Sequence, residues 1–154
     1  MSVQDIPAAA LTREEIARLI EPSAFHKLFG IDVIEVATEP EGPRLTLSMK
    51  LAEHLERQPA THQWHGGAIA AAVDITGCYT LGLLTGGPPP TVNFRTDYLR
   101  PAMTASLTLT GQVRRAGRSI GVVDVDVIDT SDRLVAVGRG CFSLVGSYPA
   151  ESAP

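Results

Sequence analysis

Cysteine and charge are both scarce in this 154-residue chain, and no run of basic residues occurs in it. The two cysteines, Cys78 and Cys141, are far apart in sequence and form neither a disulfide framework nor a metal-binding spacing. Such cysteine usage is typical of a protein from a reducing cytoplasm, which is the expected location. The formal net charge is −4, so nucleic acid is not expected as a partner.

The sequence also lacks a signal-peptide pattern and a clean membrane span. Its N-terminal residues contain no basic region followed by an apolar core. The longest apolar stretch, residues 66–84, approaches the length of a span, but it contains Asp74, Gly77 and Gly82. Because a carboxylate at the bilayer midplane is costly, we expect a buried core helix and no membrane partner.

Length and composition favour one domain. A chain of 154 residues with 44% hydrophobic content can bury a substantial core. No internal repeat or linker divides it, so we expect a single domain over residues 1–154. Within it, residues 1–29 are predicted to be a helical segment, and the tail from about 149 to 154 is predicted to fray. The low charged content of 19% suggests that partner subunits cover part of the surface.

The pattern of elements predicts an α+β fold. Thr12-Arg-Glu-Glu15 is a capping box that begins a short amphipathic helix. Alternating hydrophobicity and turn residues predict strands over 30–37, 45–49, 91–99, 104–115, 119–129 and 134–145, with the last four forming a meander. The expected architecture is an antiparallel sheet wrapped around the central helix of residues 66–84. Its long edge strand favours pairing with a second copy of the chain.

Asp74 is the one Asp, Glu, Lys or Arg residue between Arg57 and Arg95. An unpaired carboxylate is costly to remove from water, so Asp74 is expected to be paired, protonated or in use. The residues three and four positions away on a helix are small: Ala70, Ala71, Gly77 and Cys78. A substrate or another subunit's helix start is therefore predicted to approach the carboxylate closely, with Gly77 providing space.

His65, Gly66 and Gly67 stand where this helix is predicted to begin. The first backbone N–H groups of a helix lack intrahelical acceptors and point beyond its end. A structural role for His65 is as consistent with this position as a catalytic one. His62 and His65 have an i, i+3 spacing, with His54 nearby, but no further Cys, His or Asp spacing supports zinc. No metal site is expected.

Three segments together carry a family resemblance: His65-Gly66-Gly67 with an acid at Asp74, the segment Thr91–Pro101, and Val113-Arg-Arg-Ala-Gly117-Arg118-Ser119. With them, the chain resembles the hotdog-fold acyl-CoA thioesterases, specifically the phenylacetate-degradation (PaaI-like) branch. The likeness covers roughly residues 25 to 146. It implies the hotdog fold, in which an antiparallel sheet wraps around a long central helix.

The resemblance implies roles for matching catalytic positions. The Gly66 backbone N–H would hold the thioester carbonyl oxygen as negative charge develops on it, a donor typically worth ~2.7–4 kcal/mol. Asp74, from the neighbouring subunit, would act as nucleophile or as general base on water, and the sequence leaves both open. Thr91 would orient the water or the carboxylate. His65 would shape the helix start and the carbonyl pocket.

The resemblance also implies contacts with the CoA portion of the substrate. The basic turn would lie near the CoA phosphates, because the guanidinium fork suits phosphate. The positions assigned to substrate or CoA binding are Gly67, Arg114, Arg115, Gly117, Arg118 and Ser119. A solvated hairpin surface is the alternative interpretation of the three arginines.

One position departs from the family pattern. The family commonly carries Asn-Pro or a similar amide six residues before the histidine, where this chain has Pro59. Gln58 lies one residue further from His65 and would take the amide role if the loop contains one extra residue. Gln63 is a competing candidate for that polar contact.

The predicted function is hydrolysis of an acyl-CoA or aryl-CoA thioester to the free acid and CoA. No cofactor is expected beyond the CoA of the substrate. A homo-oligomer is expected, a dimer of hotdog subunits with the tetramer common in the resembled family. The alternatives are a non-catalytic acyl-CoA-binding protein and a hotdog enoyl-CoA hydratase or dehydratase, although no Asp-x-Asn-x-x-His pattern supports the latter. The sequence does not decide which acyl group is bound.

Overall fold

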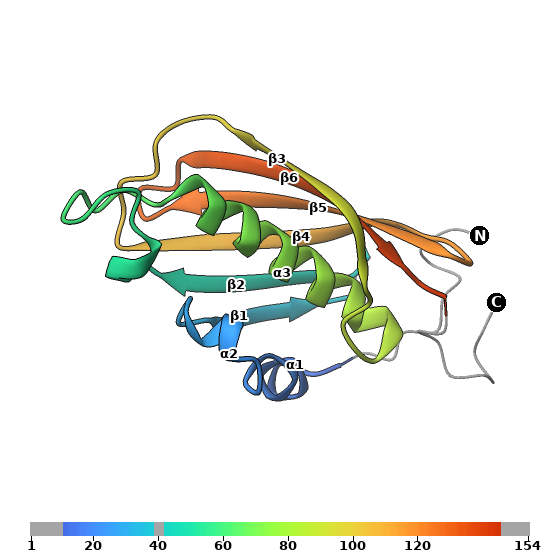
Figure 1. Cartoon of the computed structure of the whole chain (residues 1–154). Helices are drawn as coiled ribbons and strands as arrows, with labels where there is room; N and C mark the ends of the chain where they lie inside the picture. Colours follow the sequence, from blue (N-terminus) through green and yellow to red (C-terminus); the bar gives the residue numbers. More distant parts are fainter. Residues whose placement is uncertain (1–10, 39–41, 146–154) are drawn as a thin grey trace.

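A computed structural model describes residues 11–38 and 42–145, in which six strands form one sheet around a long helix (Figure 1). The helical elements are α1 (Arg13–Ile20), α2 (Ala24–Lys27), the 3₁₀ turn η2 (Glu53–Leu55) and α3 (Gly66–Thr85). The strands are β1 (Asp32–Ala37), β2 (Arg44–Lys50), β3 (Thr91–Tyr98), β4 (Ser106–Ala116), β5 (Ile120–Asp129) and β6 (Leu134–Ser143). The predicted elements are therefore present, with boundaries shifted by a few residues. Residues 1–10 of the predicted N-terminal helical segment and the tail predicted from about residue 149 lie outside the described residues.

The sheet order is β1-β2-β4-β5-β6-β3, and every neighbouring pair is antiparallel. The prediction of a four-stranded meander is wrong for β3, which pairs with β6 at one edge instead of with β4. The remaining three strands, β4, β5 and β6, do follow one another. Hydrophobic alternation determines which face of a strand is buried, but it carries no information about which edge of a sheet the strand joins.

Helix α3 forms the centre of the core and packs across one face of the sheet (Figure 1). It is the one helix in the described part of the chain that is long and apolar enough to cross a bilayer, and most of it is buried within the fold. His65 caps its start and Gly86, at φ 76°, ends it in the left-handed conformation that glycine tolerates. The residues of α3 that keep some exposure form a stripe away from the sheet: Gly66, Gly67, Ala70, Ala71, Asp74 and Cys78.

Gly77 faces the sheet, contrary to the prediction that it leaves room beside Asp74. A Cβ atom at this position would lie 2.9 Å from Cζ of Phe142 on β6. The missing side chain therefore allows the helix to approach the Phe142 ring. Ala70, Ala71 and Cys78, in contrast, do share the partly exposed stripe with Asp74.

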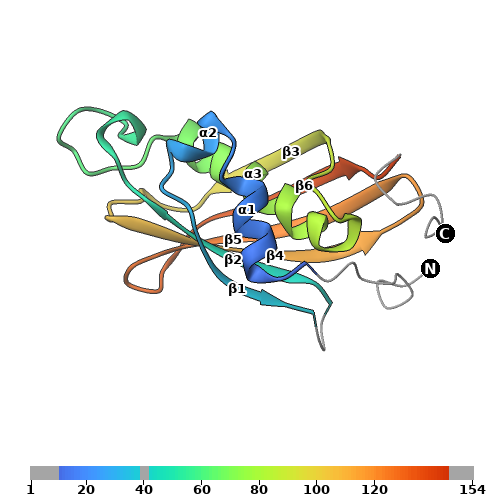
Figure 2. The ribbon, with the colours of Figure 1, turned by 90° about the horizontal axis from the view of Figure 1, so that it is seen from below.

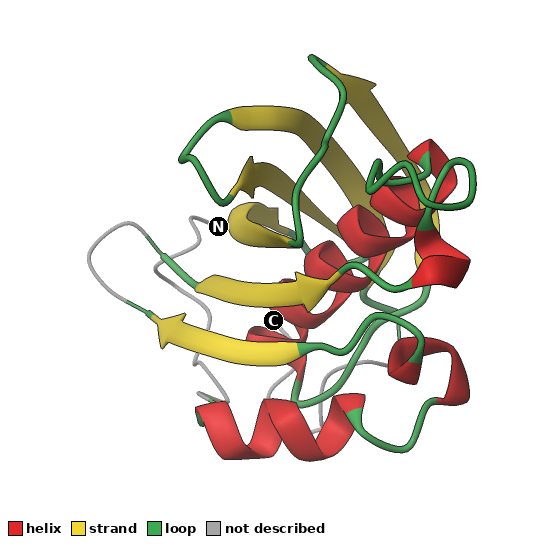
Figure 3. Ribbon diagram, turned by 90° about the vertical axis from the view of Figure 1, so that its left-hand side faces the viewer, coloured by secondary structure: helices red, strands yellow, loops and turns green. Residues whose placement is uncertain are grey.

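The N-terminal helices flank the sheet near β1 (Figure 2 and Figure 3). The predicted capping box is present, because Thr12 Oγ1 accepts from the Glu15 backbone at 3.2 Å and Glu15 Oε2 accepts from the Thr12 backbone at 2.7 Å. Tyr79 of α3 donates its hydroxyl to the Leu19 carbonyl at 3.0 Å, which fixes α1 against the central helix.

Strand β3 is an exposed edge with apolar side chains. It pairs with β6 on one side and with no other strand of the described residues. Val92 is 55% exposed, Phe94 is 41% exposed and Tyr98 is 52% exposed. An unpaired edge of this kind is a template for strand addition, and the expected pairing of an edge strand with a second copy stays a prediction.

Candidate active site

The start of α3 presents one unoccupied backbone donor. His65 has φ −68° and ψ 136°, and its Nδ1 accepts the Gly67 N–H at 2.9 Å. The His65 carbonyl accepts from the N–H groups of Ala68 at 3.0 Å and Ile69 at 3.1 Å. The Gly66 N–H has no acceptor among the described residues. Of the two glycines, Gly66 is therefore the donor available to a ligand, whereas Gly67, a position predicted to bind substrate or CoA, has its N–H occupied by the cap.

Tyr98, at the end of β3, contacts the same helix turn. Its hydroxyl donates to the Gly66 carbonyl oxygen at 2.6 Å. The ring also lies next to Gly66, since a Cβ atom there would be 3.4 Å from the Tyr98 oxygen. Tyr98 was not among the predicted site residues. Its only signal in the sequence is that it begins the aromatic-x-x-Pro pattern, Tyr98 to Pro101, at the end of the segment Thr91–Pro101.

Asp74 is half-buried on α3, and a hydroxyl group orients it. Thr91 Oγ1, at the beginning of β3, donates to Asp74 Oδ1 at 2.8 Å. The carboxylate is thus paired by one neutral donor, and no ion pair to it occurs among the described residues. One carboxylate oxygen is oriented by this bond and the other is unbonded within the described part of the chain. The unbonded oxygen can accept a proton, or its lone pair can attack an electrophile.

Cys78 lies one helical turn from Asp74, but its environment suppresses its reactivity. Burial raises the pKa of the Cys78 thiol to about 12, and the nearby Asp74 carboxylate adds to the rise. The thiol donates to the Pro89 carbonyl at 3.0 Å. Because the thiolate is the nucleophilic form of cysteine, this residue is a small core side chain beside the site.

The donor and the carboxylate of one chain do not converge. Gly66 and Asp74 are eight residues apart on the same helix, which corresponds to about 12 Å along its axis at 1.5 Å per residue. An oxyanion donor must lie about 3 Å from the carbonyl oxygen, and the attacking group must lie about as close to the neighbouring carbon. Within one subunit, the Gly66 N–H and the Asp74 carboxylate are therefore too far apart to act on the same carbonyl group.

Two hollows flank the helix start. One of about 420 Å³ is lined by Gly66, Ile69, Trp64 and Gln63 together with Tyr98 and the residues after it. The other, of about 370 Å³, has apolar walls from Phe25 of α2 and from Leu28 just after it, and it also contacts His65 and Gly67.

Of the two glutamines considered for the amide role, Gln63 lines the hollow beside Gly66. Gln58 lines neither of the two hollows and is exposed on the loop before the helix. In that loop Ala60 and His62 have positive φ values of 59° and 52°. Non-glycine residues adopt such angles only where the surrounding structure enforces them.

The basic turn of residues 113–119, here named the arginine turn, lies at the opposite end of the subunit from Gly66. Trp64 lies two residues before Gly66 and hydrogen-bonds to residues just before β4. The turn lies at the other end of that eleven-residue strand. At about 3.4 Å per residue, roughly 34 Å separates the two ends. The turn is instead close to the start of β3, because Ser143 bonds to Pro90 and Leu144 bonds to Ser119.

The three arginines of this turn are not equivalent. Arg114 Nε donates to Asp124 Oδ2 at 2.9 Å, and Arg139 binds the same carboxylate, so Arg114 is already paired. Arg115 and Arg118 are exposed and have no ion pair among the described residues. The Gly117 N–H is used within the turn, where it donates to the Ile120 carbonyl at 2.9 Å. Free cationic groups are therefore supplied by Arg115 and Arg118.

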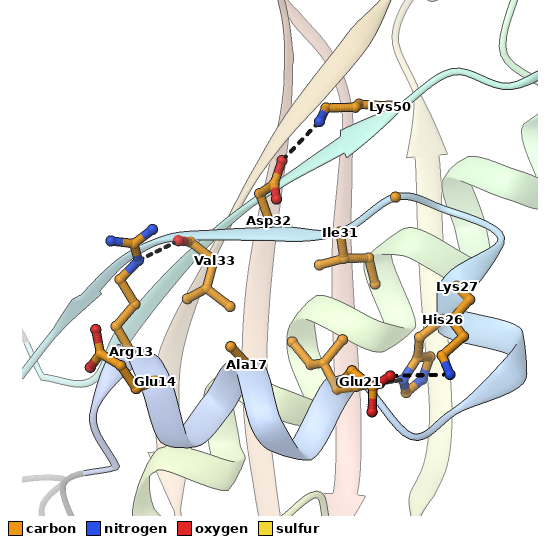
Figure 4. Close-up of a pocket in the computed structure, with 12 residues that line it drawn as sticks. Arg13, Glu14, Ala17, Glu21, His26, Lys27, Ile31, Asp32, Val33 and Lys50 are labelled. Carbon is orange, nitrogen blue, oxygen red and sulfur yellow. Dashed lines mark hydrogen bonds and ion pairs between the residues drawn. The ribbon is translucent and has the colours of Figure 1, made fainter.

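A third hollow, of about 660 Å³, lies elsewhere, between α1, α2 and β1 (Figure 4). Two ion pairs lie within it, Lys50 with Asp32 and Lys27 with Glu21, and Arg13 donates to the Val33 carbonyl at 2.7 Å, whereas the exposed Glu14 has no ion pair among the described residues. This hollow does not contact Asp74 or Gly66. Within residues 11–38 and 42–145, no three His, Cys, Asp or Glu side chains gather as metal ligands.

Comparisons with known proteins agree on one family. The thioesterase superfamily model matches residues 63–136, from just before α3 to the beginning of β6. The acyl-coenzyme A thioesterase PaaI of Escherichia coli is 29% identical over 132 residues, which cover 83% of this chain and 87% of that protein. Its solved structure superposes with a TM-score of 0.67, at 25% identity over 84% of this chain and 95% of that one.

Another solved structure, of a thioesterase superfamily protein, superposes with a TM-score of 0.77. It is 33% identical to this chain and covers 85% of this chain and 96% of its own. Both neighbours share the antiparallel sheet and long helix, so the α+β hotdog fold and the PaaI-like resemblance expected from the sequence are confirmed. With its helix start, its acid on α3 and this similarity over most of its length, the chain belongs to the thioesterase superfamily.

Proposed function

We propose that this protein hydrolyses an acyl-CoA or aryl-CoA thioester to the free acid and CoA. The observation that carries the proposal is the pair of half-sites: a free N–H at Gly66 and a hydroxyl-oriented carboxylate at Asp74. The Gly66 N–H would stabilise the developing oxyanion. Asp74 would act as nucleophile on the carbonyl carbon or as general base on water, and CoA would leave as the thiol.

The two half-sites would meet in a dimer formed through β3. Thr91 at one end of this strand holds Asp74, and Tyr98 at its other end holds Gly66. An antiparallel pair of β3 strands related by a two-fold axis brings the beginning of one strand opposite the end of the other. Each Gly66 would therefore face the partner's Asp74, which removes the 12 Å separation within one chain.

The same symmetry supports a role for the arginine turn in CoA binding. The turn lies near the start of β3, so the two-fold axis would carry it toward the partner's Gly66. Arg115 and Arg118 would bind phosphates, whereas Arg114 would stay paired with Asp124. Replacing Arg118 with Ala should raise KM several-fold for an acyl-CoA but leave it unchanged for the matching acyl-pantetheine, which lacks the nucleotide phosphates. Equal KM effects on both substrates would argue against phosphate contact.

The remaining parts of the proposal follow from this scheme. The unit of function is one hotdog domain used as a dimer, with a tetramer formed from two such dimers. The reaction requires no metal and no cofactor beyond the CoA portion of the substrate. The two free cysteines suit a reducing compartment, so we assign the protein to the cytoplasm. Of the two glutamines, Gln63 is the better candidate for the second polar contact, since it lines the hollow beside Gly66.

The deciding experiment measures free thiol released from a panel of acyl-CoAs, from phenylacetyl-CoA to palmitoyl-CoA. The wild type is compared with Asp74→Ala and Asp74→Asn, and with Asp126→Ala, which removes an exposed carboxylate of β5. We expect both Asp74 variants to lose about 10²–10⁴-fold in kcat. They should retain CoA binding and assembly, and the Asp126 variant should match the wild type.

Near-wild-type turnover in the Asp74 variants would contradict the mechanism. CoA binding without thiol release from any substrate would favour a non-catalytic acyl-CoA-binding protein. In a parallel incubation with an enoyl-CoA, loss of the enoyl-CoA absorbance without thiol release would favour a hydratase.

A further inference from the structure

We infer that Tyr98 is a positioning residue that sets the Gly66 N–H in place for the reaction. The inference rests on the proposed hydrolysis and adds a residue to it. Tyr98 Oη donates to the Gly66 carbonyl at 2.6 Å, a short distance for a hydrogen bond between neutral groups. This bond joins the end of the edge strand to the first turn of the central helix.

The helix start needs such support because two consecutive glycines form its first turn. Glycine has the largest backbone freedom of any residue, so Gly66-Gly67 by itself would leave the donor direction loosely defined. The peptide group between the two glycines is fixed from both sides. Tyr98 binds its carbonyl oxygen, and His65 Nδ1 binds its N–H at 2.9 Å.

The neighbouring peptide group, which carries the Gly66 N–H, is also fixed. Its carbonyl oxygen belongs to His65 and accepts two backbone bonds, from Ala68 and Ile69. Rotation of the Gly66 N–H therefore requires one of these groups to move. Tyr98 is the one member of this arrangement that comes from outside the helix and its cap, so it alone relates the donor to β3.

The link to β3 matters because the partner's Asp74 is positioned by the same strand of the other subunit. In the proposed dimer, Thr91 fixes the carboxylate relative to one β3 strand and Tyr98 fixes the donor relative to the other. A misplacement of about 1 Å between reacting groups is enough to reduce a rate about 10²-fold. Loss of the Tyr98 hydroxyl should therefore lower the rate of the chemical step, with a smaller effect on the affinity for substrate.

The test uses Tyr98→Phe, which removes the hydroxyl and keeps the ring. Tyr79→Phe is the matched control, because Tyr79 also donates to a backbone carbonyl, that of Leu19, away from the site. We expect Tyr98→Phe to lower kcat about tenfold with KM changed by less than about twofold. Subunit assembly by light scattering should be unchanged, and Tyr79→Phe should keep the wild-type kcat.

A double variant separates positioning from general stability. Gly66→Pro removes the N–H that Tyr98 is inferred to place, so adding Tyr98→Phe to it should change kcat by less than about twofold. A full tenfold additional loss in that background would show that Tyr98 acts elsewhere and would overturn the inference. A wild-type kcat for Tyr98→Phe would overturn it as well. Absence of hydrolysis by the wild-type protein would instead reject the proposed function, and the inference with it.

Discussion

Mixed dimers provide the sharpest test of a site shared between subunits. The two lesions are Asp74→Ala, which removes the carboxylate, and Gly66→Pro, which removes the donor. Gly66 is the first residue of α3, a position that proline favours, and its N–H has no protein acceptor to lose. His65 already has the extended conformation, φ −68° and ψ 136°, that a following proline requires. Gly66→Ala is the control that adds a Cβ atom and keeps the N–H.

The magnitude follows from the geometry of the helix. Because about 12 Å separates Gly66 from Asp74 in one chain, the proposed active site requires Gly66 from one subunit and Asp74 from the other. Each variant alone should be nearly inactive, with Gly66→Pro losing about 10²–10³-fold. A heterodimer of the two variants contains one site with both groups intact and one with neither. It should have about half of the wild-type activity per dimer.

The assay is thiol release by heterodimers purified through two different affinity tags, one on each subunit. A second heterodimer pairs a wild-type subunit with one that carries both substitutions, and it should be nearly inactive because each site then lacks one group. If both groups came from the same chain, the two results would be exchanged: no activity in the first heterodimer and half in the second. That exchange would refute the shared site.

Three further predictions concern individual side chains. Thr91→Val should lower kcat about tenfold because Asp74 loses its 2.8 Å hydroxyl bond, whereas Thr91→Ser should retain most activity in the same thiol assay. Because burial raises the pKa of Cys78 to about 12, the native Cys141→Ser protein should not react with Ellman's reagent at pH 8. After unfolding, its one remaining thiol should release one equivalent of the reagent's thiolate. Rapid labelling of the native protein would refute this prediction. The hydrogen bond from Arg139 holds the pKa of Asp124 below its usual value, so its stabilisation is complete above about pH 4 and is lost as pH falls through the lowered pKa of the folded state. Asp124→Asn should therefore destabilise the fold by about 1 kcal/mol at pH 7 and progressively less toward pH 2, as measured by thermal unfolding. A stability difference between variant and wild type that grows on acidification would contradict the stabilising role of the ionised Asp124.

Local features of the sequence predicted the elements well. The capping box at Thr12 and Glu15 needs only neighbouring residues, and it forms as expected. The alternation in Val123, Val125 and Val127 places these side chains in the core with at most 1% exposure. Such patterns act within one turn or one strand, so they are readable without knowledge of the rest of the fold.

The sequence also located the candidate site along the chain, although not its internal contacts. His65 caps α3 and leaves the Gly66 N–H free, as expected for a helix start. The resemblance to thioesterases suggested Thr91 as an orienting residue, and the structure brings its hydroxyl to Asp74. Nothing local indicated that the Tyr98 hydroxyl would reach Gly66, because 32 residues separate the two in sequence.

By itself, then, the sequence determined the helix and strand positions, the helix start with its free donor, and the family to which the chain is similar. Only the tertiary structure decided that β3 is the outer strand beside β6, that Gly77 faces Phe142 instead of the ligand, and that the two ends of β3 hold the two half-sites. The physical reason is range. Capping and periodicity are set by residues a few positions apart, whereas strand neighbours and packing partners depend on how the chain returns to itself across the core.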